Sequence, residues 1–122
     1  MAQVLIIDDD ELLRTALTHK LRERGIEAEQ AIDGQKGLEL AKMDPPQVIV
    51  LDERMPKMTG DEFITAVQKE PWFSNVHIVV FTASDDTKLL YNSLKAGVTD
   101  YLDKTSATPD SIAELVAKYV QA

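Results

Sequence analysis

The chain has 122 residues, of which 44% are hydrophobic and 28% charged, with a formal net charge of −8 and no cysteine. This length and composition are typical of one globular domain with a substantial core. The negative charge, without a basic stripe, argues against direct nucleic-acid binding and favours cations or basic partners. The lack of cysteine excludes disulfides and thiolate metal sites.

The apolar runs are too short for a membrane-spanning helix, which needs roughly 20 consecutive apolar residues. The start, MAQVLIID, has neither the basic segment nor the long apolar segment of an export signal. We therefore expect a cytoplasmic protein that does not bind membranes. No linker, low-complexity run or internal repeat is visible, so residues 1–122 are expected to form one domain.

Apolar runs and amphipathic segments alternate in the first half of the chain. A uniformly apolar run predicts a buried strand, and leucines spaced four apart predict the apolar face of a helix. An aspartate before a helix and a glycine or proline after it are typical boundaries. In chain order these patterns predict a strand at Val4–Ile7, a helix with Leu13, Leu17 and Leu21 that ends at Gly25, an edge strand at Ile26–Ala31, a helix from Asp33 through Met43, and a buried strand at Val48–Leu51.

The alternation continues in the second half. The pattern predicts a loop with Pro56 and Gly60, a helix through about Lys69, a strand at His77–Phe81, a helix at Thr87–Ala96, a short strand at Asp100–Leu102, and a last helix with Thr108 as N-cap and Pro109 as first residue. Five strands alternating with five helices predict an α/β domain. We expect a doubly wound five-stranded parallel sheet between two helical layers, a flavodoxin-like three-layer sandwich.

Polar side chains follow the predicted strands. In doubly wound sheets, ligands bind at the carboxyl ends of the strands, near the point where the strand order reverses. The residues expected there are Asp8, Asp9 and Asp10, then Asp52, Glu53 and Arg54, then Thr82, Ala83 and Ser84, and finally Lys104. Carboxylates without Cys or His favour Mg²⁺. Three acids (Asp8, Asp9 and Asp52) would be balanced by Mg²⁺ and Lys104, so that Lys104 and the Thr82 hydroxyl could contact an incoming anion.

The three consecutive acids at the first strand end repel one another, and the repulsion is poorly screened next to a core. We interpret Asp8 and Asp9 as metal ligands and Asp10 as the N-cap of the next helix. Without a cation the repulsion remains. Replacing Asp9 by asparagine is therefore expected to stabilise the metal-free fold and to weaken metal binding.

Asp52 is the candidate nucleophile. A carboxylate can attack phosphorus to give an aspartyl phosphate, and a metal ion with a lysine would stabilise the charge on the transferring phosphoryl group. Asp52 is preferred over the other acids because it stands alone at the end of a central strand, outside the acidic cluster.

Four segments in this order and spacing resemble the receiver domain of bacterial two-component response regulators. They are LIIDDDELLR (5–14), VIVLDERMPKMTG (48–60), VVFTAS (79–84) and AGVTDYLDK (96–104). The resemblance covers essentially the whole chain and implies a phosphorylation-dependent signalling switch with Mg²⁺ as cofactor. The roles it implies are phosphoacceptor for Asp52, metal ligands for Asp8, Asp9, Asp52 and the main-chain carbonyl of Arg54, phosphoryl binding for Thr82 and Lys104, and switching for Thr82 and Tyr101.

The same resemblance implies the partners. A sensor histidine kinase, a phosphotransfer protein or a small acyl phosphate would donate the phosphoryl group, and an output domain or a downstream protein would receive the signal. The surface made by the fourth helix, fifth strand and fifth helix would dock outputs or form a homodimer. Turnover would be limited to self-phosphorylation and hydrolysis, so the chain is expected to be a switch rather than an enzyme.

The sequence departs from the family pattern beside two site residues. Thr105 stands where the family usually has a proline, often after a cis bond. A cis bond before threonine costs about 2.5–4 kcal/mol, against about 0.5–1 kcal/mol before proline, so we expect a trans bond and a reshaped loop. Glu53 replaces the commoner apolar residue after the acceptor. Arg54 is expected to cover the acceptor partly and to alter hydrolysis.

Other interpretations stay open at this point. A degenerate receiver could serve only as a docking module. A haloacid-dehalogenase-like phosphatase would use Asp8 as its nucleophile, but such enzymes need a longer chain, and Glu11 stands where they usually have threonine. A flavodoxin-like cofactor binder is disfavoured because no Gly/Ser/Thr-rich phosphate loop follows the first strand. A stand-alone receiver and a segment of a larger regulator both fit the sequence.

Overall fold

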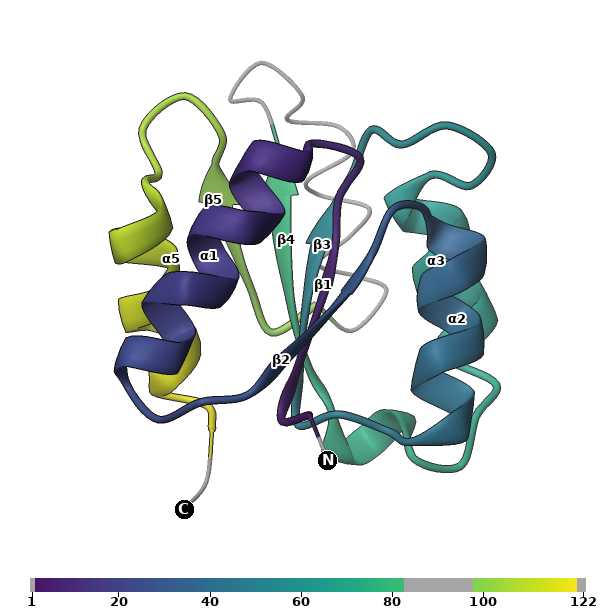
Figure 1. Ribbon diagram of the computed structural model, residues 1–122. Helices are drawn as coiled ribbons and strands as arrows, with labels where there is room; N and C mark the ends of the chain where they lie inside the picture. Colours follow the sequence, from purple (N-terminus) through teal and green to yellow (C-terminus); the bar gives the residue numbers. More distant parts are fainter. Residues whose placement is uncertain (1, 83–97, 121–122) are drawn as a thin grey trace.

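The computed structural model describes residues 2–82 and 98–120, and for Thr82 the main chain only. Five parallel strands form one sheet in the order β2-β1-β3-β4-β5 (Figure 1). They are β1 (Val4–Ile7), β2 (Ala28–Ala31), β3 (Val48–Asp52), β4 (His77–Thr82) and β5 (Asp100–Asp103). This order confirms the predicted doubly wound parallel sheet.

Helices cover both faces of the sheet. One layer contains α1 (Glu11–Glu23) and α5 (Pro109–Ala117), and the other contains α2 (Gly34–Met43) and α3 (Gly60–Val67) (Figure 1). A short 3₁₀ turn, Phe73–Asn75, precedes β4. The helix expected at Thr87–Ala96 falls outside the described residues. None of the described helices is long and apolar enough to cross a membrane.

The central strands are buried on both faces because successive side chains point to opposite sides of a sheet. Alternate residues therefore belong to two separate core clusters. The cluster under α1 and α5 includes Val4, Ile6, Val48, Val50, Leu17, Leu21 and Ile112. The cluster under α2 and α3 includes Leu5, Ile7, Ile49, Leu51, Ala41, Phe63 and Ile64. The uniformly apolar runs in the sequence thus reflect two cores that share one sheet.

The predicted N-caps are confirmed. The Asp10 carboxylate accepts hydrogen bonds from the main-chain N–H groups of Leu12 and Leu13, at 3.0 and 3.3 Å. The Asp33 carboxylate accepts from the N–H of Lys36 at 2.9 Å. Each cap satisfies donors that the first helical turn leaves without a partner.

The strands β3, β4 and β5 each end one residue later than predicted. Two other boundaries differ from the prediction by two residues, for local reasons. The second strand begins at Ala28 and not at Ile26, because the Ile26 N–H completes the end of α1 by donating to Leu21 O at 2.9 Å. Helix α3 ends at Val67 and not near Lys69, because the following residues form a turn in which Glu70 N donates to Val67 O at 2.9 Å.

Candidate functional site

The strand order places the first acidic segment next to the candidate acceptor. The chain runs from β1 outward to β2 and then crosses to β3 on the other side of β1, so the crevice of the fold lies between the carboxyl ends of β1 and β3. Ile7 of β1 is in register with Leu51 of β3. Asp8 and Asp52 therefore leave the sheet side by side.

Asp8, Asp9 and Asp52 form a cluster that fits a hard divalent cation. Within the described residues, one carboxylate oxygen from each of the three lies within 4.8 Å of the others. Asp8 and Asp52 are each only 2% exposed, whereas Asp9 is exposed. Three carboxylates with one side open to solvent match Mg²⁺, which binds to a few carboxylates and keeps several waters. The structure thus brings together the three predicted carboxylate ligands.

Burial makes the charged form of Asp8 costly. Its pKa is raised from 3.8 to about 7, chiefly because burial removes the carboxylate from water, and the negative charges of Asp52 and Asp9 add to the increase. The N–H of Asp10, 2.9 Å from Asp8 Oδ1, and the ammonium of Lys104 oppose the increase. This corner of the site is therefore short of positive charge without a cation.

Asp52 is a buried carboxylate with a nearby ammonium. Lys104 Nζ lies 3.2 Å from Asp52 Oδ2, and the N–H of Arg54 donates to Oδ1 at 3.3 Å. Burial raises the pKa of Asp52, while Lys104 and the Arg54 N–H act in the opposite direction. Both carboxylate oxygens are thus held in place at the end of a central strand.

The β5–α5 loop brings Lys104 to the site without a cis bond. The described peptide bonds contain no cis form, which confirms the expected trans bond before Thr105. Asp103 organises the loop instead: its Oδ1 accepts from the N–H and the hydroxyl of Thr105 at 2.9 and 2.8 Å, and its main-chain oxygen accepts from Ala107 N at 2.9 Å. With this trans bond the loop directs Lys104 at Asp52.

The other predicted site residues are Thr82, Arg54 and Tyr101, with Ser84 beside them in the sequence. Thr82 is the last residue of β4, in register with Asp103, but its side chain lies outside the described residues, as does all of Ser84. The Arg54 side chain is exposed. Tyr101 is 38% exposed within β5, and its switch role stays a prediction.

Glu53 has a structural role in the loop after β3. The sequence showed only that its residue type is unusual at this position. Glu53 points to the opposite face of the sheet from Asp52 and is 2% exposed. Its Oε1 accepts from the N–H of Asp61 at 3.2 Å, and its main-chain oxygen accepts from Gly60 N at 2.9 Å. A carboxylate at the N-terminus of α3 is favoured by the helix dipole. Glu53 thus ties together the two ends of the β3–α3 loop, which contains Arg54.

Arg14 was missed by the sequence reasoning. The buried positions of α1 are Arg14, Leu17, Thr18 and Leu21, spaced three, four and seven residues from the first. An arginine on the apolar face of a predicted helix was the signal that could have found it. Its guanidinium contacts the main-chain oxygen of Asp8.

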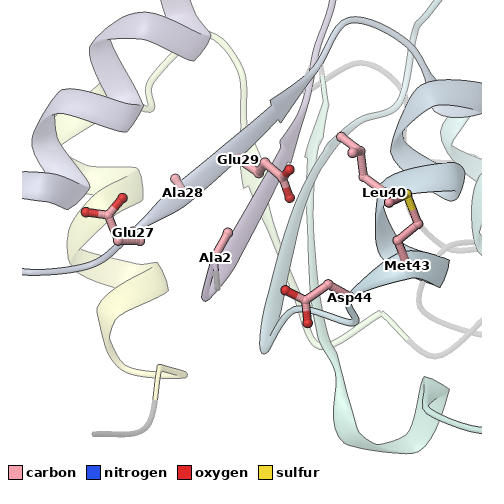
Figure 2. A pocket seen from close by; sticks show the side chains of 7 residues that line it. All are labelled: Ala2, Glu27, Ala28, Glu29, Leu40, Met43 and Asp44. Atoms are coloured by element: carbon pink, nitrogen blue, oxygen red, sulfur yellow. The ribbon is translucent and has the colours of Figure 1, made fainter.

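A hollow of about 380 Å³ at the other end of β2 contains none of the predicted site residues. It lies between the start of β2 and the end of α2 (Figure 2). Its lining residues are Ala2, Glu27, Ala28, Glu29, Leu40, Met43 and Asp44. This hollow is therefore separate from the cluster of Asp8, Asp9 and Asp52.

Comparison with known sequences agrees with this geometry. Residues 4–117 match the family described as "Response regulator receiver domain". Response regulator MprA of Mycolicibacterium vanbaalenii is 33% identical over 115 residues, which are 94% of this chain and 49% of that protein. Hybrid signal transduction histidine kinase D of Dictyostelium discoideum is 39% identical over 90 residues, 74% of this chain and 6% of the kinase. The chain spans about half the length of the first of these relatives and a small part of the second.

Solved structures give the same result at the level of the fold. The chemotaxis response regulator CheY4 of Vibrio cholerae is 30% identical, with a TM-score of 0.88 over 98% of this chain and 99% of that one. The receiver domain of Francisella response regulator 1452 is 28% identical, with a TM-score of 0.85 over 98% of this chain and 96% of that one.

Proposed function

The chain belongs to the response regulator receiver family, and we propose that it is a signalling switch that accepts a phosphoryl group on Asp52. The observation that carries this proposal is the position of the Asp52 carboxylate. It is buried at the end of β3, clustered with Asp8 and Asp9, and 3.2 Å from the Lys104 ammonium. A carboxylate in this setting has the electrostatic surroundings that phosphoryl transfer requires.

The carboxylates and the main-chain carbonyl of Arg54 would hold Mg²⁺, which when bound neutralises negative charge on the acceptor and on the incoming phosphoryl oxygens. A carboxylate oxygen of Asp52 attacks the phosphorus of the donor in line. The new bond joins Asp52 to phosphorus, and the bond from phosphorus to the donor breaks, so that its electron pair leaves with the imidazole or acyl oxygen. Lys104, already at Oδ2, and the Thr82 hydroxyl then bind the phosphoryl oxygens.

The donor is a sensor histidine kinase, a phosphotransfer protein or an acyl phosphate. The kinase of Dictyostelium that resembles this chain is by its name a hybrid histidine kinase, which supports this class of partner. Movement of Thr82 and Tyr101 carries the signal to the surface formed by β5, α5 and the helix predicted at Thr87–Ala96. An output domain, a downstream protein or a second copy docks there.

Residues 1–122 form one cytoplasmic receiver domain without nucleic-acid or membrane contacts of its own.

This proposal is tested by incubating the wild-type chain with acetyl phosphate and measuring its intact mass. With Mg²⁺ we expect the mass of one phosphoryl group to be added, and hydroxylamine, which cleaves acyl phosphates, to remove it. With a chelator in place of Mg²⁺ we expect no addition, because the three acids then lack their counter-charge. A chain whose mass never changes would instead support the docking-module interpretation.

Arg54 is expected to slow hydrolysis of the phosphorylated form. Its exposed, positively charged side chain follows Asp52 by two residues and can shield the phosphoryl group from water. Arg54→Ala should therefore lose its phosphoryl group severalfold faster than wild type after the donor is removed. Arg24→Ala, at the far end of α1, removes the same charge and side chain and should match wild type. Equal rates for Arg54→Ala and wild type would contradict the shielding role.

A further inference from the structure

Arg14 joins α1 to the acidic segment through two hydrogen bonds. Its side chain is buried, with 8% exposed. The guanidinium Nη1 donates to the main-chain oxygen of Asp8 at 2.7 Å, and Nε donates to the side-chain oxygen of Gln30 on β2 at 3.2 Å. The planar guanidinium presents several donors in a fixed geometry, which allows one side chain to hold both acceptors. The 2.7 Å contact is short, as expected of a charge-assisted hydrogen bond.

This contact fixes the peptide that links two of the metal ligands. The Asp8 oxygen belongs to the planar peptide unit that leads into Asp9. On the other side of Asp8, its N–H donates to Ala31 O of β2 at 3.2 Å. The Asp8 main chain is thus held from both directions, by β2 through its N–H and by Arg14 through its C=O. The orientation of the Asp8–Asp9 peptide determines the direction in which the Asp9 side chain leaves the chain.

We propose that Arg14 is a positioning residue for the metal site, because it orients the Asp8–Asp9 peptide so that both carboxylates meet Asp52. Asp9 depends on it most, since its side chain is exposed and little packing restrains it. Asp8 is restrained independently by the Asp10 N–H at its carboxylate, 2.9 Å away. Residues that orient metal ligands in this way typically change metal affinity about 10- to 100-fold when replaced. The inference rests on the proposed function in one respect, that this site binds Mg²⁺.

The test is calorimetric titration of Mg²⁺ into the metal-free chain, without a phosphodonor. We expect Arg14→Gln and Arg14→Lys each to weaken Mg²⁺ binding about tenfold. The lysine keeps the positive charge, but its single ammonium group replaces the planar guanidinium that holds both acceptors. Arg22→Gln is the matched control: it removes the same charge from the same helix at an exposed position, and its affinity should stay within about twofold of wild type. Urea unfolding of each metal-free variant shows whether it folds. If Arg14→Gln does not fold, the Mg²⁺ affinity of Arg14→Lys provides the test.

A double-mutant cycle separates positioning from a general loss of packing. If Arg14 acts through Asp9, Arg14→Lys should have little further effect on Mg²⁺ affinity in the Asp9→Asn background. Additive losses in the cycle, or wild-type affinity in Arg14→Lys, would overturn the inference. A wild-type chain that binds no Mg²⁺ would overturn the proposed function together with the inference. If the wild-type chain binds Mg²⁺ and Arg14→Lys binds it equally well, the inference is overturned but the proposed function is not.

Discussion

Asp52→Asn will take up no phosphoryl group from acetyl phosphate and Mg²⁺, under conditions that modify the wild-type chain. The amide is nearly the same size as the carboxylate, so the fold should persist. It lacks the nucleophilic oxygen anion that attacks phosphorus, and it removes the negative partner of Lys104 at 3.2 Å. Intact mass after a fixed incubation is the measurement, and the expected effect is loss of the signal to the level of the donor-free control.

Two further variants make this result specific. Asp44→Asn removes an acid at the end of α2, far from the site, and should be modified like wild type. Asp8→Asn tests the phosphatase-like alternative, in which Asp8 is the nucleophile. A phosphoryl group that persists in Asp52→Asn and disappears in Asp8→Asn would show that the wrong carboxylate has been chosen as acceptor.

The metal-free wild-type chain will become less stable as the pH rises from about 4 to about 8, and Asp8→Asn will remove most of that dependence. The pKa of Asp8 is about 7 in the folded chain, against an ordinary value of 3.8. Between these values the folded state holds a proton that the unfolded state has released, so raising the pH favours unfolding. The stabilisation of the folded state by this proton on Asp8 is complete below about pH 4 and is lost as the pH rises through about 7. Its size is on the order of 4 kcal/mol.

The free energy of unfolding in urea, measured with a chelator at pH 4, 6 and 8, tests this. Asp8→Asn should be more stable than wild type at pH 8 by an amount approaching that figure, and close to wild type at pH 4. Asp9→Asn removes the same charge from the adjacent, exposed residue and should give a much smaller gain. Mg²⁺ at pH 8 should stabilise wild type, since it binds only the folded site. If the free energy of unfolding changed with pH in the same way for wild type and Asp8→Asn, Asp8 would not be the source of the pH dependence.

The adjacent acids Asp8 and Asp9 differ in what they cost the metal-free fold. The repulsion among consecutive acids predicts that neutralising Asp9 stabilises this fold. The structure assigns the larger cost to Asp8, because Asp8 is buried at 2% exposure beside Asp52 while Asp9 faces water. Water screens the charge of an exposed carboxylate, whereas burial leaves it without compensating interactions. Adjacent residues of the same type thus differ in energy through their surroundings.

Local features of the chain were sufficient to predict the sheet, most of its boundaries and the acids that meet at its edge. Apolar runs marked the strands, Asp10 and Asp33 capped the helices that follow them, and parallel strands bring their carboxyl ends to one edge. Each of these depends on neighbours within a few residues, or on the one topology that alternating strands and helices favour.

Contacts between distant segments were decided only by the tertiary structure. Three features of the site depend on which elements pack together. They are the burial of Asp8, the ion pair between Lys104 and Asp52 across 52 positions of the chain, and the hydrogen bonds of Arg14 to Asp8 and Gln30. The spacing of residues along a strand or helix shows which face a side chain occupies, but not what lies against that face. The energy of a charged group is determined by that opposing surface, through lost water and nearby charges. For this reason the sequence predicted which acids gather at this edge of the sheet, but not their protonation or the contacts that support them.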